Sequence, residues 1–322
     1  MKKVLIIGGL GFIGSNLARK YAADINTKVT VLDNLDNRCG GNIFNIESFR
    51  SKLEYLNIDI LKQKTLKNII VDKDLIINCA AISSHSLSMQ DPWSNLRVNV
   101  DSVLKILECM KSISSPSRLI QIGTTTQTGP VDNNKHAQEN HFESPIDIYS
   151  ANKLIAEKYT NIYSSTYGID ITNIRLSNIY GPRAAIHSSK LTFNNYFIGL
   201  ALQNKEITVY SPGEQLRNSL FIDDAVEAIY MAGNSPKARN QTFQVVSDDH
   251  FSILEIAEKT SKIIGGSVSL IEWPNQNTQD IGNVKFSNQK IKSILGWRPI
   301  YNMEEGLSKT KEYFSKNLKH YI

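Results

Sequence analysis

The chain has 322 residues, of which 41% are hydrophobic, and it carries a formal net charge of +5 at pH 7. The length exceeds the ~250–300 residues at which single cores stop growing, so we expect two packed regions. Lysines and arginines form no dense basic run, so a small phosphate-bearing ligand explains the net positive charge as well as nucleic acid would. No apolar stretch reaches the ~18 residues that a membrane helix needs.

The three cysteines, Cys39, Cys79 and Cys109, show neither metal-site spacing nor a CxxC pair. The N-terminus has no charged segment followed by a signal-type apolar stretch. We therefore expect a cytoplasmic protein without a metal site, a nucleic-acid partner or a membrane partner.

The first motif is an apolar run of strand length, residues 2–7, that stops at glycines spaced three apart. A helix-compatible segment follows at once, which is the strand, turn and helix order of a dinucleotide site. Gly8, Gly11 and Gly14 would let the backbone turn tightly and approach a pyrophosphate, whose charge a helix N-terminus favours.

The next strand, residues 29–33, ends at Asp33, which lies 19 residues after Gly14. This spacing is close to that of an acid that binds the adenosine ribose, and it predicts NAD rather than NADP because a carboxylate repels a 2′-phosphate. The alternative is an ordinary strand-to-helix turn beside a surface Asp.

Strands and helices alternate through the first half of the chain. The predicted elements are a helix over 15–23, an Asn- and Gly-rich loop over 34–51, strands over 53–59, 75–81 and 119–122, and a helix within 95–110. This alternation predicts an α/β fold with a doubly wound parallel sheet of Rossmann type, over residues 1–177.

Residues 127–146 contain few apolar side chains and predict a surface excursion, after which a helix begins near Ile148. On this helix Tyr149 and Lys153 are four residues apart and therefore lie on one face. Such a pair is common by chance on helices. Downstream of a dinucleotide motif and a Thr-rich strand end, it becomes the most informative pair in the chain.

Residues 178–322 predict a smaller α/β substrate domain, some of whose segments return to the first domain. We expect a strand near 174–183 that breaks at Gly181, a helix near 191–203 and a strand over 207–210. A helix capped by Asp224 and a last helix from Met303 would follow.

As a set, these motifs resemble the extended short-chain dehydrogenase/reductase family of nucleotide-sugar epimerases and dehydratases, and within it the 4-epimerases. The resemblance covers nearly the whole chain and rests on residues 8–15, Asp33-Asn34, Asp59-Ile60, Ala80-Ala81, Asn99-Val100, Thr124, Tyr149 with Lys153, residues 175–183, Arg217 and residues 295–299.

The resemblance implies an NAD-dependent enzyme that acts on a nucleoside-diphosphate sugar and forms a homodimer through the helices near 95–110 and 148–165. NAD would be held by Gly8, Gly11, Phe12, Ile13, Asp33, Asn34, Asp59, Ile60, Ala80, Ala81, Asn99, Tyr149 and Lys153. Thr124, Tyr149 and Lys153 would be catalytic, and Thr124, Asn178 and Arg217 would bind the substrate.

A free tyrosine, with a pKa of ~10, is a poor base at neutral pH, and the charges of Lys153 and the nicotinamide would stabilise its phenolate. Thr124 would align the sugar hydroxyl that loses its proton. Inversion at C4 would then pass through a transient 4-keto sugar.

Dehydratases of this family carry Asp-Glu or Ser-Glu directly after the catalytic Thr, where this chain has Thr125 and Thr126. This difference favours a 4-epimerase. A 4,6-dehydratase, a nucleotide-sugar decarboxylase and a 4-keto reductase remain as alternatives, and a non-catalytic NAD-binding protein is a further one. His85 and His187 lie in segments that could border the site, and each is interpreted as a surface or packing residue rather than a catalytic one. Arg183 could equally bind a phosphate or a strand-end carbonyl.

Overall fold

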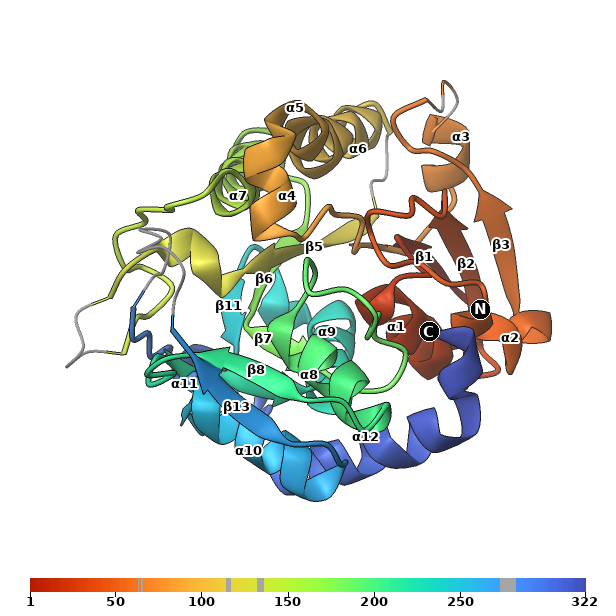
Figure 1. Ribbon diagram of the computed structural model, residues 1–322. Coiled ribbons are helices and arrows are strands. Elements are labelled where there is room, and N and C mark those ends of the chain that lie inside the picture. The colour runs from red at the N-terminus through yellow and green to blue at the C-terminus, as the bar shows by residue number, and fades with distance from the viewer. Residues whose placement is uncertain (63, 65, 114–116, 132–135, 273–281) are drawn as a thin grey trace.

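The computed structural model describes residues 1–62, 64, 66–113, 117–131, 136–272 and 282–322. Within these ranges seven strands form one sheet in the order β11-β6-β5-β4-β1-β2-β3, and every neighbouring pair is parallel (Figure 1). The strands are β1 (Lys2–Ile7), β2 (Thr27–Asp33), β3 (Leu53–Asn57), β4 (Leu75–Asn78), β5 (Arg118–Thr124), β6 (Ile171–Leu176) and β11 (Thr242–Val245). The predicted doubly wound parallel sheet is confirmed.

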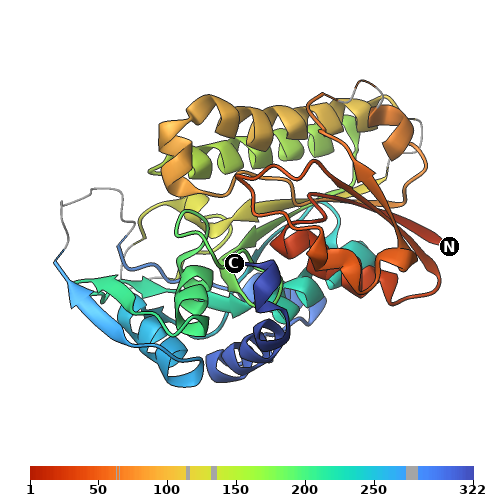
Figure 2. The same ribbon diagram turned by 45° about the vertical axis from the view of Figure 1, so that its right-hand side comes forward.

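Successive side chains of a strand point to opposite faces of the sheet. Helices cover both faces, so the side chains on each face are buried. Val4 and Ile6 of β1 pack with α1 (Phe12–Ala22) and α9 (Ile222–Asn234). Leu5 and Ile7 pack on the other side with α3 (Leu66–Ile70), α6 (Ser102–Lys111) and α7 (Ile148–Tyr167). Figure 2 shows the sheet between these two helix layers.

β1 pairs with β2 on one side and with β4 on the other, so the order in which strands are added to the sheet reverses at β1. In an open parallel sheet, ligands bind outside the carboxyl ends of the strands at such a reversal of strand order. The fold therefore places the end of β1, at Ile7 and Gly8, at the expected binding crevice.

The second half of the chain builds a smaller layer beside this edge of the sheet (Figure 1). Its short pairs are β7 (Asn178–Tyr180) with β10 (Ser219–Phe221), β9 (Leu216–Arg217) with β12 (Phe251–Ser252), and β8 (Ile207–Tyr210) with β13 (Val268–Ile271). Its helices are α8 (Phe193–Leu202), α10 (Ile253–Ile263), α11 (Gln289–Leu295) and α12 (Met303–Asn317). β11 comes from this half and pairs with β6 at the edge of the large sheet. The boundary between two domains after residue 177 stays a prediction.

The predicted loop over residues 34–51 is wrong in part, because it contains α2 (Phe44–Glu47) and a 3₁₀ turn (Arg50–Lys52). The Asn42 side chain accepts a hydrogen bond from the backbone N–H of Phe44, and the Asn45 side chain donates to the carbonyl of Leu10. Tertiary contacts thus stabilise turns that local composition does not indicate.

The predicted helix over 95–110 is three pieces: α5 (Pro92–Leu96), a π-helical segment (Arg97–Asp101) and α6. The wider turn explains the mixed period of the apolar residues before Val103. It also turns Asn95 and Asn99 inward, where both amides donate to the carbonyl of Ile82.

Asp224 was expected to cap a helix, and this prediction is wrong. α9 begins at Ile222, so Asp224 lies inside its first turn. Its carboxylate accepts hydrogen bonds from the backbone N–H groups of Ile300 and Tyr301 and so fixes the segment that leads into α12.

α6 and α7 pack against each other at the top of Figure 1, and Leu104, Ile155 and Ile162 on these helices are exposed. The resemblance implies a four-helix dimer contact here, and the homodimer stays a prediction. Across the described ranges, none of the helices combines the length and apolar character needed to cross a membrane.

Candidate active site

The glycines after β1 form a cradle that excludes side chains. A Cβ on Gly8, where φ is +75°, would lie 2.7 Å from the backbone N of Ala80, and a Cβ on Gly14 would lie 2.2 Å from the carbonyl oxygen of Gly8. α1 begins at Phe12 with Gly11 as its N-cap, and no side chain caps it. Backbone N–H groups at the start of α1 are thus available to an anion, as a dinucleotide pyrophosphate requires.

Two adjoining cavities follow the crevice. The smaller one, of about 120 Å³, contains most of the residues predicted to hold NAD: Gly8, Gly11, Asp33, Asn34, Asp59, Ile60, Ala80 and Ala81 line it. The second, of about 450 Å³, shares Gly8, Gly11 and Ala81 with the first and adds Phe12, Ile13, Thr124, Tyr149, Lys153 and Asn178. The shape and the lining of this crevice fit NAD.

Asp33 lies at the end of β2 and lines the smaller cavity. One carboxylate oxygen accepts a hydrogen bond of 2.9 Å from the Leu10 N–H, and the other accepts one of 2.8 Å from the Leu35 N–H. Burial raises the pKa of Asp33, and these hydrogen bonds oppose the increase. Each oxygen keeps a lone pair for a further donor, as the predicted contact with ribose hydroxyls requires.

Asn99 does not line either cavity. Its buried amide donates to the carbonyl of Ile82 at 3.1 Å and to the side-chain oxygen of Asn95 at 2.8 Å. Asn99 therefore supports the loop after β4, and a direct contact between Asn99 and NAD stays a prediction.

Thr124, Tyr149 and Lys153 are brought together where β5 ends beside the first turns of α7. Tyr149 and Lys153 lie one turn apart on α7, and Thr124 is the last residue of β5. The ammonium group of Lys153 donates to the carbonyl of Ile122 at 2.9 Å. All three line the same cavity, as the sequence predicts.

Burial is the largest influence on the pKa values of Tyr149 and Lys153. Burial raises the pKa of Tyr149, the charge of Asp147 raises it further, and a hydrogen bond with Thr124 opposes both effects. Burial lowers the pKa of Lys153 to about 8. A buried phenol needs nearby positive charge to ionise, and Lys153, one turn away on α7, is the buried amine that lines the same cavity.

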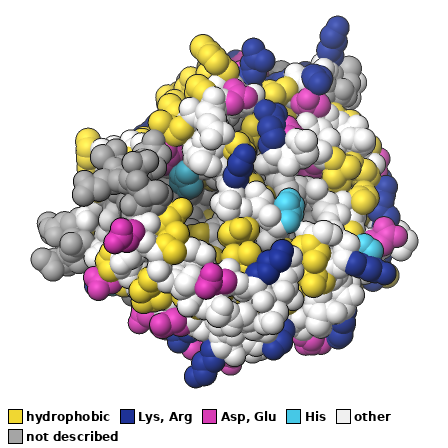
Figure 3. All heavy atoms as spheres, in the orientation of Figure 1, with side chains coloured by type: hydrophobic (Ala, Val, Ile, Leu, Met, Phe, Trp, Pro, Cys, Tyr) yellow, Lys and Arg dark blue, Asp and Glu magenta, His cyan; other side chains and the backbone are white. Residues whose placement is uncertain are grey.

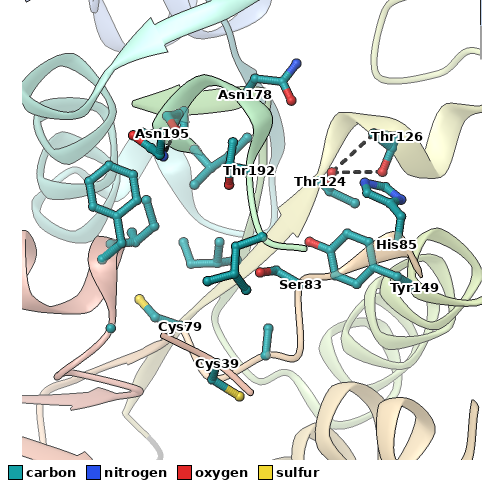
Figure 4. A pocket seen from close by; sticks show the side chains of 18 of the residues that line it. Cys39, Cys79, Ser83, His85, Thr124, Thr126, Tyr149, Asn178, Thr192 and Asn195 are labelled. Carbon is teal, nitrogen blue, oxygen red and sulfur yellow. Dashed lines mark hydrogen bonds between the residues drawn. The ribbon is translucent and has the colours of Figure 1, made fainter. Parts of the chain in front are cut away.

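His85 is at the site, although the sequence indicated a surface or packing residue. Its Nδ1 lies 2.9 Å from Oδ2 of Asp147, and its ring packs edge-on against the Tyr149 ring with centroids 5.1 Å apart. Figure 4 shows His85 beside Tyr149 and Thr126. His85 and Asp147 are 62 residues apart, and no local pattern indicates that they meet.

Arg183 and His187 do not contribute to the site. Arg183 donates to the carbonyl of Asn45 and to the side chain of Asn16, which favours the carbonyl-binding interpretation over the phosphate-binding one. His187 is exposed and does not line the cavities described here, as the sequence indicated.

A third cavity, of about 640 Å³, shares His85, Thr126 and Asn178 with the second cavity and extends toward the smaller layer. The predicted substrate-binding residues Asn178 and Arg217 line it, together with His85 and Thr126. Arg217 donates to the carbonyls of Leu216 and Gly282. On the face seen in Figure 3, Lys and Arg side chains are dispersed among Asp and Glu and do not form one basic patch.

The comparisons with known proteins agree with this geometry. The chain is 28% identical to UDP-glucuronic acid decarboxylase 1 of Xenopus tropicalis over 99% of this chain and 73% of that protein. It is 27% identical to a UDP-glucose 4-epimerase of Mycolicibacterium smegmatis over 97% of this chain and 98% of that protein. The crystal structure of a Thermotoga maritima UDP-glucose 4-epimerase with UDP-glucose matches with a TM-score of 0.88 at 25% identity, over 98% of this chain and 99% of that one.

The model of one family, the NAD dependent epimerase/dehydratase family, matches residues 4–246. These residues include the glycine cradle, Thr124, Tyr149 and Lys153, and most of the residues that line the third cavity. The chain therefore belongs to the NAD-dependent epimerase/dehydratase family of enzymes, and its cofactor is NAD.

Proposed function

We propose that this enzyme inverts C4 of a nucleoside-diphosphate sugar through a transient 4-keto sugar. The observation that carries this proposal is the position of Thr124, Tyr149 and Lys153 between the NAD crevice and the third cavity. Thr125 and Thr126, rather than Asp-Glu or Ser-Glu, follow Thr124. NAD, held by the residues of the crevice, would supply the reversible hydride acceptor that oxidation at C4 requires.

Tyr149 is the base that removes the proton from the C4 hydroxyl and later returns it to the inverted oxygen. Lys153 stabilises the phenolate, and Thr124 orients the hydroxyl within hydrogen-bonding reach of Tyr149. Because the proton returns to the sugar, the net reaction needs no additional acid.

A 4,6-dehydratase is the second candidate, and the position of His85 favours it. Elimination across C5 and C6 needs groups that remove the C5 proton and protonate the leaving hydroxyl, and threonine hydroxyls do neither at neutral pH. His85 lines both larger cavities and is a titratable side chain that stands on a different element from Thr125 and Thr126.

Turnover in deuterium oxide distinguishes the two candidates. We would incubate the NAD-loaded enzyme with UDP-glucose, UDP-glucuronic acid and UDP-N-acetylglucosamine, and with GDP-, CDP- and dTDP-sugars, and read the products by anion exchange and proton NMR. The 4-epimerase proposal predicts a C4 epimer that keeps its protons at C5 and C6. Deuterium at C5, or a new 6-methyl signal, would overturn it in favour of the dehydratase.

Asp33 is expected to make the enzyme prefer NAD over NADP, because its carboxylate would accept from ribose hydroxyls and repel a 2′-phosphate. Asp33→Asn should weaken NAD binding by about 1.5–3 kcal/mol, the range of a charged hydrogen bond. It should also reduce the difference in affinity between NAD and NADP. Calorimetric titration with both cofactors measures this, with the exposed Asp72→Asn as control. Equal affinity of the unmodified protein for NAD and NADP would refute the role.

Arg217 is proposed to bind the diphosphate of the substrate. Arg217→Ala should weaken UDP binding by about 1.5–3 kcal/mol and leave NAD binding intact. Arg239→Ala, which removes a more exposed arginine outside the cavities, is the matched control. If UDP affinity measured by calorimetry does not change, another residue binds the diphosphate.

A further inference from the structure

The sugar of the substrate is expected where the second and third cavities meet. Under the proposed function, C4 reacts beside Thr124 and Tyr149 in the second cavity, and Arg217 in the third cavity binds the diphosphate. The sugar ring connects these two groups of the nucleotide sugar, so it lies at the meeting point. We call the residues that line both cavities the junction.

The junction carries little charge. Among the described residues, His85 is the only member of the junction with a titratable side chain. Of these two cavities, Lys153 and Lys190 line only the second, and Asp147 and Arg217 line only the third. The other members of the junction are Thr125, Thr126, Ser177, Asn178, Ser189 and Phe193. Hydroxyl and amide side chains hydrogen-bond neutral sugar hydroxyls and supply no full charge to a carboxylate.

Asp147 determines which nitrogen of His85 carries a hydrogen. Burial tends to raise the pKa of Asp147, but the hydrogen bond and charge of His85 and the bonds from Ser150 outweigh burial and lower it. An ionised carboxylate can only accept hydrogen bonds. Nδ1 of His85 lies 2.9 Å from Oδ2 of Asp147, so Nδ1 carries the hydrogen and donates it. In neutral His85 the other nitrogen, Nε2, therefore has a lone pair and is an acceptor.

Nε2 remains available to a substrate. The bond from Nδ1 is the one hydrogen bond that the His85 ring makes among those of the described residues. The His85 side chain is 49% exposed, whereas that of Asp147 is 7% exposed. The His85 ring packs edge-on against Tyr149 with centroids 5.1 Å apart, and Figure 4 shows it beside Thr126. An acceptor thus lies beside the tyrosine at which C4 reacts.

We propose that the substrate is a neutral sugar, one hydroxyl of which donates a hydrogen bond to Nε2 of His85, and that the site disfavours uronic acids. A hydroxyl can supply the hydrogen that Nε2 lacks, whereas a carboxylate has acceptors only. A carboxylate at the junction would also face the negative charge of Asp147 behind His85, and like charges in a binding site are costly. This inference names the substrate class of the site described above, and it rests on the proposed function.

The measurement is calorimetric titration of the NAD-loaded protein with UDP-glucose, UDP-glucuronic acid and UDP. Tyr149→Phe is the background, because it retains the ring that packs against His85 and prevents turnover during the titration. At pH 8.5, about two units above the pKa of free histidine, imidazole is neutral. UDP-glucose should bind at least about tenfold more tightly than UDP-glucuronic acid. Equal or tighter binding of UDP-glucuronic acid would overturn the proposal.

His85→Phe keeps an aromatic ring against Tyr149 and removes both nitrogens. UDP-glucose affinity should fall by about two- to tenfold, the effect of losing one neutral hydrogen bond, whereas UDP affinity should not change. His187→Phe is the matched control, because His187 is exposed and lines neither cavity. Thermal melting shows whether each variant folds. If His85→Phe bound UDP-glucose as tightly as the background protein does, Nε2 would not contact the sugar and the proposal would fail.

Asp147→Asn should exchange the roles of the two His85 nitrogens. Oδ1 of Asp147 accepts from the Ser150 N–H at 2.9 Å, so the amide oxygen of the variant keeps this place and its nitrogen takes the place of Oδ2. That nitrogen would donate to the Ser150 hydroxyl and to Nδ1 of His85, which leaves the hydrogen of the ring on Nε2. Asn is also a good N-cap, so α7 keeps its start.

With Nε2 as a donor and one negative charge removed, Asp147→Asn should bind UDP-glucuronic acid about tenfold more tightly than the background protein does. UDP-glucose affinity should change little, because a hydroxyl accepts as well as donates. Adding His85→Phe to Asp147→Asn removes the donor and leaves the charge change, so it should reverse about two- to tenfold of the gain. A gain that persists in full in this double variant would show that charge alone discriminates, against the role of Nε2.

The binding preference and the reaction can fail separately. A protein that inverts C4 of UDP-glucuronic acid and binds it as tightly as UDP-glucose keeps the 4-epimerase proposal and refutes the neutral-sugar inference. A protein that shows the expected preference but gives no C4 epimer with the sugar panel keeps the inference and refutes the reaction.

Discussion

Tyr149→Phe is expected to lower turnover of the nucleotide sugar by about 10²–10⁴-fold, the range that a positioned base contributes. The change removes only the oxygen that handles the proton. The Tyr149 ring keeps its edge-on contact with His85. NAD affinity and the melting temperature should therefore change little.

Tyr167→Phe is the matched control, since Tyr167 ends the same helix and is half exposed. Initial rates with the sugar identified by the panel, together with NAD titration and thermal melting, separate loss of chemistry from loss of fold. More than about a tenth of the unmodified rate in Tyr149→Phe would assign the base to another residue.

Lys153→Met is expected to reduce turnover by about ten- to a hundredfold and to move the pH profile toward alkaline pH. The positive charge of Lys153 favours the phenolate of Tyr149, so its removal raises the pKa of the base. Each unit of that increase corresponds to about 1.4 kcal/mol and to a tenfold smaller fraction of phenolate below the pKa. The rate should recover in part as pH rises, because hydroxide then ionises the phenol.

Lys158→Met tests whether any lysine on α7 has this effect. Lys158 lies on the same helix, is largely exposed and forms an ion pair with Glu143. Its replacement should leave both the rate and the pH profile unchanged. If Lys153→Met lowered the rate equally at every pH, Lys153 would act by placing the cofactor rather than by stabilising the phenolate.

Several features followed from local patterns because the physics behind them is local. The end of β1 at glycines, the position of Asp33 at the end of β2, and the shared face of Tyr149 and Lys153 depend on periods of two and 3.6 residues and on the conformational freedom of glycine. These patterns were enough to predict the parallel sheet and the dinucleotide crevice, whereas the catalytic roles of Thr124, Tyr149 and Lys153 came from the family resemblance and stay predictions.

Other features depend on contacts between distant segments. Asn45 stabilises α2 through the carbonyl of Leu10, and Asp224 binds backbone groups near residue 300, so neither composition nor helix-start rules indicate their roles. At the π-helical segment before α6, the amides of Asn95 and Asn99 both donate hydrogen bonds to the carbonyl of Ile82, which is a contact with a separate segment of the chain.

The sequence by itself determined the parallel sheet, the glycine turn after β1 and the shared helical face of Tyr149 and Lys153, because each is encoded within one strand, turn or helix. Only the tertiary structure decided that His85 at the start of α4 (His85–Gln90) meets Asp147 at the N-cap of α7, and that the hydroxyls of Thr124, Thr126 and Ser150 form a hydrogen-bonded series that ends at Asp147. Hydrogen bonds between side chains depend on positions in space within about 3 Å, and no spacing along the chain specifies such positions across 62 residues.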